Sequence, residues 1–314
     1  MTDISPRPPT APLAGLVRLL TGRRRAAPRR EPVAPTPFGA LAPAMPEPAL
    51  LLLPEPAAPT LPASPAEAGG PARAYPALHA PRDGFVFVVT YGRSGSTLTQ
   101  RLLNALPGWC IRGENANLTY HLAQIAHLAA THEMYAMRRT DAVRPREERH
   151  LYTRDLVGEA HDPWWGVEAV DPDDLRLSLM NLFAEKVLRL PSGTRVGGFK
   201  EIRQWEDAGF FARHLDVLKE SFPNARFLFQ KRGHEAVARS QWWRKLDAAV
   251  VARRLATADR LFEDYAAANP ERSFVIEHER YAEGAPYVRE ILGFLGEALD
   301  DAAIEAVLAS RLNH

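Results

Sequence analysis

Hydrophobic positions between residues 84 and 311 follow two alternating patterns. Short continuous apolar runs, typical of strands buried on both faces, alternate with longer segments in which apolar residues recur every three or four positions, as in helices. We predict strands at 85–90, 194–200, 225–231 and 273–277. We predict helices at 97–106, 117–138, 173–189, 210–220, 235–243, 248–268, 287–296 and 300–311. This alternation indicates an α/β fold, in which a mostly parallel sheet is flanked by helices.

Residues 140–165 interrupt this alternation. The segment is polar, basic and aromatic, and its apolar residues follow neither spacing. We predict a long irregular excursion here, with Trp164 and Trp165 as candidates for an apolar lid over an acceptor substrate.

The first 82 residues differ in composition from the rest. Nineteen of the 27 prolines lie within residues 1–81, mixed mainly with alanine. Such a segment buries too little apolar surface to offset the entropy lost on ordering. We therefore expect a disordered tail at 1–82 and a single α/β domain at 83–314. Within the tail, apolar residues 13–20 followed by Arg23, Arg24 and Arg25 predict either a basic amphipathic helix that docks on an anionic membrane or acidic partner, or a solvated basic segment.

Composition and charge narrow the functional classes. Lys and Arg number 39 against 38 Asp and Glu, so the net charge of +1 gives no overall attraction to nucleic acid. Cys110 is the only cysteine, and the ten histidines show no metal-ligand spacing. No stretch approaches the ~20 apolar residues that span a bilayer, and no signal peptide is recognisable at the N-terminus. We expect a cytoplasmic protein without a bound metal, in peripheral contact with the inner membrane face if the tail docks there.

The segment 85–98 carries the clearest functional signal. A buried strand runs into the turn Gly92-Arg93-Ser94-Gly95-Ser96-Thr97, and a helix follows. Glycines let the backbone curl around a phosphate, while N–H groups at a helix start and hydroxyls donate to it. A Walker A loop has the pattern G-x-x-x-x-G-K-[ST], and its lysine is missing here. We therefore predict a P-loop-like phosphate site that is not built for Mg-ATP.

A second anion site is predicted at the end of the strand at 225–231. Arg232 lies where open α/β sheets bind ligands, and Ser240 follows eight residues later on a helix. Arg232 offers a planar fork for phosphate oxygens, and Ser240 offers a hydroxyl. Taken alone, this pattern is also compatible with an ordinary surface cation.

Together, the two segments resemble sulfotransferases that use 3′-phosphoadenylyl sulfate (PAPS). The turn is similar to the 5′-phosphosulfate loop of the carbohydrate and tyrosylprotein branches, which has the pattern R-[ST]-G-[ST]-[ST]. Arg232 and Ser240 match the R-x₇-S pair that binds the 3′-phosphate in that family. The resemblance covers about residues 84–310. It implies PAPS as co-substrate, no metal, and a binding set of Arg93, Ser94, Gly95, Ser96, Thr97, Arg232 and Ser240.

Three further segments support this resemblance. Glu114, in Arg112-Gly113-Glu114, matches the catalytic glutamate that tyrosylprotein sulfotransferases place in a Gly-Glu pair after the first helix. Residues 198–203, with Lys200 at a strand end, resemble a motif of bacterial sulfotransferases. Residues 275–279 and 291–296 resemble the late Y-E-D-L and L-x-F-L-G motifs only partly, because His278 replaces the tyrosine and Arg280 the aspartate.

The resemblance implies in-line transfer of a sulfuryl group to an acceptor hydroxyl. Glu114 is then expected to act as general base, with Lys200 and Arg93 stabilising charge around the transferred group. Each assignment has a simpler alternative, since Glu114 could be a surface carboxylate and Lys200 could pair with a nearby acid. Glu201 competes for the role of base. Neighbours along a strand face opposite sides, so Lys200 and Glu201 are not expected to enter one site.

Trp205, Trp242 and Trp243 are expected in the core, although one of them could stack on adenine.

Two other functions stay open. A P-loop kinase or NTPase would bind Mg-ATP, whereas a non-catalytic scaffold would bind nucleotide without transferring any group. The sequence does not identify the acceptor, for which a carbohydrate or lipid hydroxyl is favoured.

Overall fold

The domain is built on a five-stranded sheet. The computed structural model describes residues 70–240 and 242–309. The strands are β1 (Gly84–Thr90), β2 (Trp109–Arg112), β3 (Val196–Glu201), β4 (Arg226–Lys231) and β5 (Ser273–Glu277). They lie in the order β2-β3-β1-β4-β5, and every pairing is parallel. The predicted α/β class with a parallel sheet is confirmed. Sequence analysis missed β2, a four-residue edge strand too short to show a pattern.

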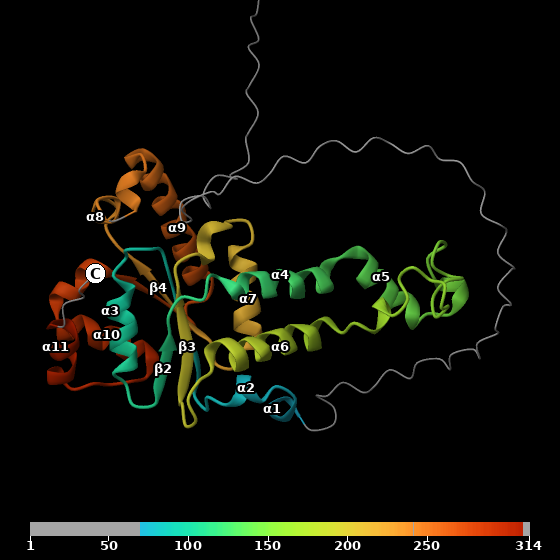
Figure 1. The fold of residues 1–314 in the computed structure, drawn as a ribbon, viewed down its shortest axis with the longest axis horizontal. Helices are drawn as coiled ribbons and strands as arrows, with labels where there is room; N and C mark the ends of the chain where they lie inside the picture. Colours follow the sequence, from blue (N-terminus) through green and yellow to red (C-terminus); the bar gives the residue numbers. More distant parts are fainter. Residues whose placement is uncertain (1–69, 241, 310–314) are drawn as a thin grey trace, which may run out of the picture. The chain divides into compact units, whose positions relative to one another are not determined.

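Helices cover both faces of this sheet, as Figure 1 shows. Residues of β1 alternate between two apolar cores, because successive side chains of a strand point to opposite faces. Phe85, Phe87 and Val89 belong to one core, whereas Val86 and Val88 belong to the other. The helices are α1 (Pro71–Ala74), α2 (Pro76–His79), α3 (Ser96–Asn104), α4 (Leu118–Thr131), α5 (Glu133–Ala142), α6 (Pro172–Phe183), α7 (Phe211–Ser221), α8 (His234–Ala238), α9 (Ala248–Ala268), α10 (Ala285–Leu295) and α11 (Asp301–Ala309).

The described part of the domain begins before the predicted boundary at residue 83. Leu78 is fully buried, and Tyr75, which precedes α2, donates a 2.6 Å hydrogen bond to Asp174 of α6. The backbone N–H of Ala77 donates to Asn181, also on α6. Residues 71–82 therefore belong to the domain, and the prediction that they form part of a disordered tail is wrong. The predicted basic helix at 13–25 lies outside the described residues.

The predicted helix at 117–138 is divided in two. Extended backbone at His132 ends α4, and the His132 side chain accepts a hydrogen bond from the Met134 N–H at the start of α5. The excursion then packs on α5, where Arg138 and Asp162 form a buried ion pair. Figure 1 shows α5 and this excursion at the far end of α4 from the strands.

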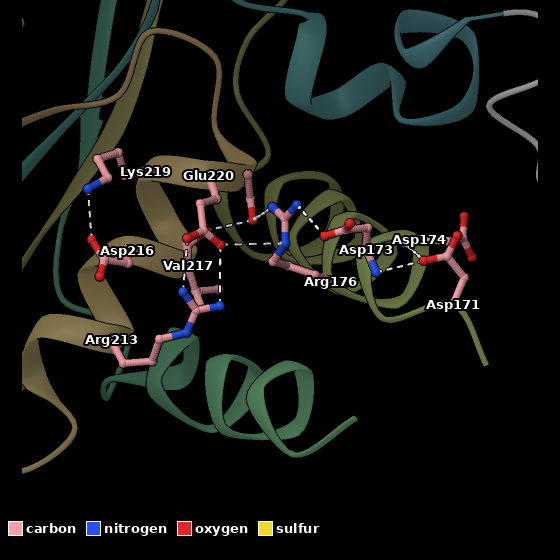
Figure 2. A network of polar contacts seen from close by, with 10 residues as sticks. Asp171, Asp173, Asp174, Arg176, Arg213, Asp216, Val217, Lys219 and Glu220 are labelled. Atoms are coloured by element: carbon pink, nitrogen blue, oxygen red, sulfur yellow. Dashed lines mark hydrogen bonds and ion pairs between the residues drawn. The ribbon is translucent and has the colours of Figure 1, made fainter. Parts of the chain in front are cut away.

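A network of ion pairs ties α6 to α7 (Figure 2). Asp171 caps the N-terminus of α6 by accepting from the N–H groups of Asp173 and Asp174. Arg176 then donates to Ser221 at the end of α7, and its guanidinium also lies 3.0 Å from Asp173. These contacts fix the layer on which α4 rests. No helix in the described ranges is long and apolar enough to cross a membrane.

His214 makes this layer sensitive to acid. It is fully buried on α7, and its Nε2 lies 3.0 Å from the Thr119 hydroxyl of α4. Burial lowers the pKa of His214 to about 3, and the nearby His121 adds to the effect. In the unfolded chain a histidine titrates at ~6.5. Between this pH and the lower pKa of the folded state, only the unfolded state binds a proton at His214.

We therefore predict that the free energy of unfolding falls as the pH drops below about 6.5. The contribution of His214 should amount to about 2 kcal/mol between pH 7 and pH 5. Urea denaturation at both pH values measures it, and His214→Gln should reduce the difference by that amount. His161→Gln, at an exposed histidine, is the control. Equal pH dependence in wild type and His214→Gln would contradict the assignment.

Candidate active site

A cavity of about 540 Å³ lies at the carboxyl ends of the central strands. It is lined by residues at or after the carboxyl ends of β1, β2, β3, β4 and β5, including Arg93, Thr97, Glu114, Lys200, Arg232 and His278. The chain runs from β1 to β2 on one side of the sheet, and later crosses from β3 over β1 to β4 on the other side, so the strand order reverses at β1. Open α/β sheets bind ligands at such a point.

The loop after β1 forms the floor of this cavity. Arg93 and Gly95 have left-handed backbones, with φ of 73° and 84°, and α3 starts immediately afterwards at Ser96. Ser96 and Thr97 line the cavity, so the N-terminus of α3 faces it. A Cβ at Gly95 would lie 2.3 Å from the His278 ring. Only glycine fits this position.

Ser94 is turned into the protein rather than into the cavity. It is fully buried, and its hydroxyl lies 2.7 Å from that of Thr90. Its carbonyl oxygen accepts a 2.9 Å hydrogen bond from the side-chain amide of Gln230 on β4. The Ser94 side chain therefore shapes the loop, in place of the direct phosphate contact that the motif predicts.

Gln230 connects the loop to the rest of the site, and sequence analysis did not identify it. Its side-chain oxygen accepts from the Thr99 hydroxyl of α3, and its backbone carbonyl accepts from Thr90 at 2.7 Å. The Thr99 hydroxyl also lies 2.7 Å from that of Tyr281. All partners are buried and distant in sequence, so no local pattern could have revealed this network.

Three residues predicted to bind the nucleotide lie together. The Arg93 Nε donates a 2.9 Å hydrogen bond to the Ser240 hydroxyl, and Arg232 donates to the Arg93 carbonyl oxygen at 3.1 Å. The backbone of Arg232 is fixed by Tyr91, whose hydroxyl contacts both its N–H and its carbonyl oxygen. Arg93 thus lies with the predicted 3′-phosphate residues, and would have to leave Ser240 to reach a transferred group elsewhere in the cavity.

Two buried nitrogen atoms beside this cluster have no hydrogen-bond partner within the described part of the chain. They are Nε of Arg232 and Nδ1 of His278. Buried polar atoms are nearly always paired in native proteins, so unpaired ones in a cavity suggest a ligand. Burial lowers the pKa of His278, and the positive charge of Arg232 lowers it further. These atoms fit a ligand that carries oxygen anions.

Glu114 and Lys200 meet on the other side of the loop. Lys200 Nζ lies 2.6 Å from one carboxylate oxygen of Glu114, and Arg203 lies 3.3 Å from the other. The Lys200 side chain is almost fully buried, whereas that of Glu114 is 35% exposed. Glu114 is therefore the carboxylate that a substrate in the cavity can reach, although it is paired with two cations.

Glu201 points away from the cavity, as strand alternation predicted. It is fully buried, and one of its oxygens accepts from the backbone N–H groups of Asn115 and Asn117. Its other oxygen accepts from the N–H of Ile202 and lies 3.2 Å from Arg203. Since every contact of this carboxylate is internal, its geometry favours Glu114 over Glu201 as the base.

The tryptophans separate into two groups. Trp205 and Trp243 are buried, as expected for core residues, and the Trp243 indole donates to the Gly92 carbonyl oxygen. Trp242 is 44% exposed, lines the cavity and stacks on Trp243. It is the tryptophan available for stacking on a base. Trp164 and Trp165 lie in the excursion beyond α5, outside the cavity lining, so the structure does not place them as a lid.

Comparison with known proteins defines the class. Residues 86–301 match the model of the sulfotransferase family, which is more than half of the chain. The chain therefore belongs to the sulfotransferase family, as its motifs indicated. Comparison with curated proteins gives no match.

Among solved structures, the chain is similar to bacterial sulfotransferases. The sulfotransferase domain of the Synechococcus PCC 7002 olefin synthase is 20% identical, with 72% of this chain and 77% of that chain covered and a TM-score of 0.42. STF1 of Mycobacterium tuberculosis H37Rv is 16% identical, with 76% and 74% covered and a TM-score of 0.40. A sulfotransferase of Alicyclobacillus acidocaldarius is 16% identical, with 72% and 96% covered and a TM-score of 0.35.

The contact between Gly95 and His278 gives a test of the loop. We predict that Gly95→Ala lowers the affinity for adenosine 3′,5′-bisphosphate by at least about tenfold, because the new Cβ displaces the ring and strains the backbone. Calorimetric titration measures the affinity. Gly158→Ala is a matched control, since Gly158 has a similar φ of 90° but nothing within 4 Å of the added Cβ. Unchanged affinity in Gly95→Ala would show that the nucleotide does not use this loop.

Proposed function

We propose that the protein transfers a sulfuryl group from PAPS to an acceptor hydroxyl. The observation that supports this most strongly is the arrangement of charge around the β1 loop. Arg93 and Arg232 lie on the β4 side, whereas Lys200, Arg203 and Glu114, the single carboxylate among the described lining residues, lie on the β3 side, and all five line one cavity. The reaction requires both sides of the cavity. A nucleotide phosphorylated at two positions needs the cations of the β4 side, and an acceptor that must lose a proton needs the carboxylate of the β3 side.

The β4 side suits the nucleotide. Arg232, with its unpaired Nε, and the Ser240 hydroxyl would hold the 3′-phosphate, whereas the N-terminus of α3 with Ser96 and Thr97 would hold the 5′-phosphate. Trp242 would stack on the adenine. Arg93 contributes a further positive charge between these groups.

The β3 side suits the transfer. The Glu114 carboxylate would accept the proton of the acceptor hydroxyl as the new oxygen–sulfur bond forms. The bond between sulfur and the 5′-phosphate oxygen breaks in the same in-line displacement, and adenosine 3′,5′-bisphosphate leaves. Lys200 would neutralise the charge that grows on that bridging oxygen, as fixed cations do in phosphoryl transfer.

This mechanism requires Lys200 to change partners. In the structure its ammonium is bound to Glu114 at 2.6 Å. Oxygen anions of a bound co-substrate would compete for Lys200 and release one Glu114 oxygen to accept a proton. With this exchange of partners, the buried cation of Lys200 would be neutralised both by Glu114 and, in turn, by the co-substrate.

Nucleotide selectivity tests this function. We predict that adenosine 3′,5′-bisphosphate at a hundred times its Kd raises the free energy of unfolding by about 2.7 kcal/mol, which corresponds to several degrees in Tm. Mg-ATP at the same concentration should have a smaller effect, since the loop lacks the Walker A lysine.

Incubation with ³⁵S-labelled PAPS and extracts of the source cells should yield a labelled acceptor. Stronger stabilisation by Mg-ATP would favour a kinase or NTPase, and nucleotide binding without a labelled product would favour a scaffold.

A second prediction concerns the base. Glu114→Gln should lower kcat by about 10²- to 10⁴-fold, because the amide cannot accept the proton, while the Kd for adenosine 3′,5′-bisphosphate stays within about threefold. Steady-state kinetics and calorimetry give the two values. The matched control is Glu206→Gln, at an exposed glutamate outside the cavity lining, which should leave both unchanged. Near-wild-type turnover in Glu114→Gln would exclude Glu114 as the base.

The acceptor is proposed only as a hydroxyl compound, with carbohydrate and lipid favoured. A cytoplasmic location and contact of residues 13–25 with a membrane surface stay predictions from the sequence.

A further inference from the structure

The turn that carries Glu114 has an unfavourable backbone. Between β2 and α4, two consecutive non-glycine residues, Ala116 and Asn117, have left-handed φ values of 57° and 58°. Asparagine tolerates this conformation, but the Cβ of alanine makes it costly. A strained turn persists only where surrounding groups hold it. What holds this one therefore determines where Glu114 lies.

The Glu201 carboxylate is the group that holds it. One oxygen accepts the N–H of Asn115 at 3.0 Å and that of Asn117 at 2.8 Å, so a single atom binds the turn on either side of Ala116. Glu201 is itself fixed by its place in β3, opposite Val89 of β1, and it is fully buried. The turn is thereby fastened to the centre of the sheet.

Arg203 links this clamp to the catalytic pair. One of its nitrogens lies 3.2 Å from Glu201 and 3.3 Å from Glu114. The buried charge of Glu201 thus has a partner, and that partner also contacts the carboxylate proposed as base. Glu201 therefore acts on Glu114 in two ways, through the backbone of the turn and through a shared guanidinium.

We infer that Glu201 is a positioning residue, whose buried carboxylate holds Ala116 and Asn117 in left-handed backbone and so places Glu114 against Lys200. This inference rests on the proposed function, in which Glu114 is the base. Glu201 does not itself touch the substrate. Without it the turn relaxes toward right-handed backbone, and Glu114 moves away from the reacting hydroxyl.

The experiment compares Glu201→Gln and Glu201→Ala with a rescue variant. We expect kcat for sulfuryl transfer to fall about tenfold in Glu201→Gln and at least a hundredfold in Glu201→Ala. The Kd for adenosine 3′,5′-bisphosphate should change less than threefold, because the nucleotide residues lie on the other side of the loop. Adding Ala116→Gly to Glu201→Ala should restore kcat about fivefold or more, since glycine adopts left-handed backbone without the cost that alanine incurs.

Asn224→Gly provides the matched control for the rescue. Asn224 also has a left-handed φ, of 51°, but lies before β4, away from the cavity. A purely structural role for Glu201 would change stability, kcat and Kd together, and both glycine substitutions would then act alike. Wild-type kcat in Glu201→Ala, a parallel loss of nucleotide affinity, or equal rescue by Asn224→Gly would overturn the inference.

Amide hydrogen exchange tests the clamp without any activity. The N–H groups of Asn115 and Asn117 should exchange at least tenfold faster in Glu201→Gln than in wild type, whereas the amides of β1 keep their protection. Unchanged exchange at both positions would overturn the clamp, even in an active enzyme. Faster exchange in Glu201→Gln, together with a wild-type protein that transfers no sulfuryl group, would uphold the clamp and refute the proposed function. The glutamine variant serves for all comparisons if Glu201→Ala does not fold.

Discussion

The hydrogen bonds of Gln230 are the interaction on which the site depends. This side chain on β4 binds the loop through the Ser94 carbonyl oxygen and binds α3 through the Thr99 hydroxyl, while its backbone accepts from Thr90 at the end of β1. A strand, a loop and a helix are thus fastened at one buried point. Opening the loop would leave the buried Gln230 amide without hydrogen-bond partners, which would destabilise the folded protein. The loop is therefore held closed against the sheet. Anion recognition here is therefore a property of the folded sheet as much as of the loop.

The distribution of charge also favours an anionic ligand in the cavity. The chain carries nearly equal numbers of acidic and basic residues, yet the residues described around the cavity include four cationic side chains and one carboxylate. Many of the other charges are paired on the outside, as in the α6–α7 network of Figure 2. The net charge therefore does not indicate the kind of ligand, whereas the local excess of arginine and lysine at the strand ends indicates an anionic one. The sulfotransferase family to which the chain belongs agrees with that local excess.

The sequence predicted those features that depend on neighbours along the chain. The buried strands β1, β4 and β5, helix α9 and the glycine turn follow from apolar spacing and local backbone chemistry. Contacts between distant residues could not be predicted. Ser94 matches a phosphate-binding pattern, yet its hydroxyl is turned toward Thr90. Glu201 looked like a rival base until the structure placed it beneath Asn115 and Asn117. Helices α1 and α2 were not predicted, because their segment is rich in proline and its stabilising contacts are with Asp174 and Asn181 of α6, far away in the sequence.

The histidine beside Gly95 has a thermodynamic consequence. His278 resists protonation partly because Arg232 is charged. An anion that neutralises Arg232 removes this repulsion and makes the imidazole more basic. Ligand binding and proton uptake at this site are then linked, so each promotes the other by the same factor. A tyrosine at this position, as in the late motif that this segment resembles, titrates near ~10 and would not take up a proton near neutral pH. His278 thus adds a link between anion binding and acidity that arginine and lysine side chains do not supply.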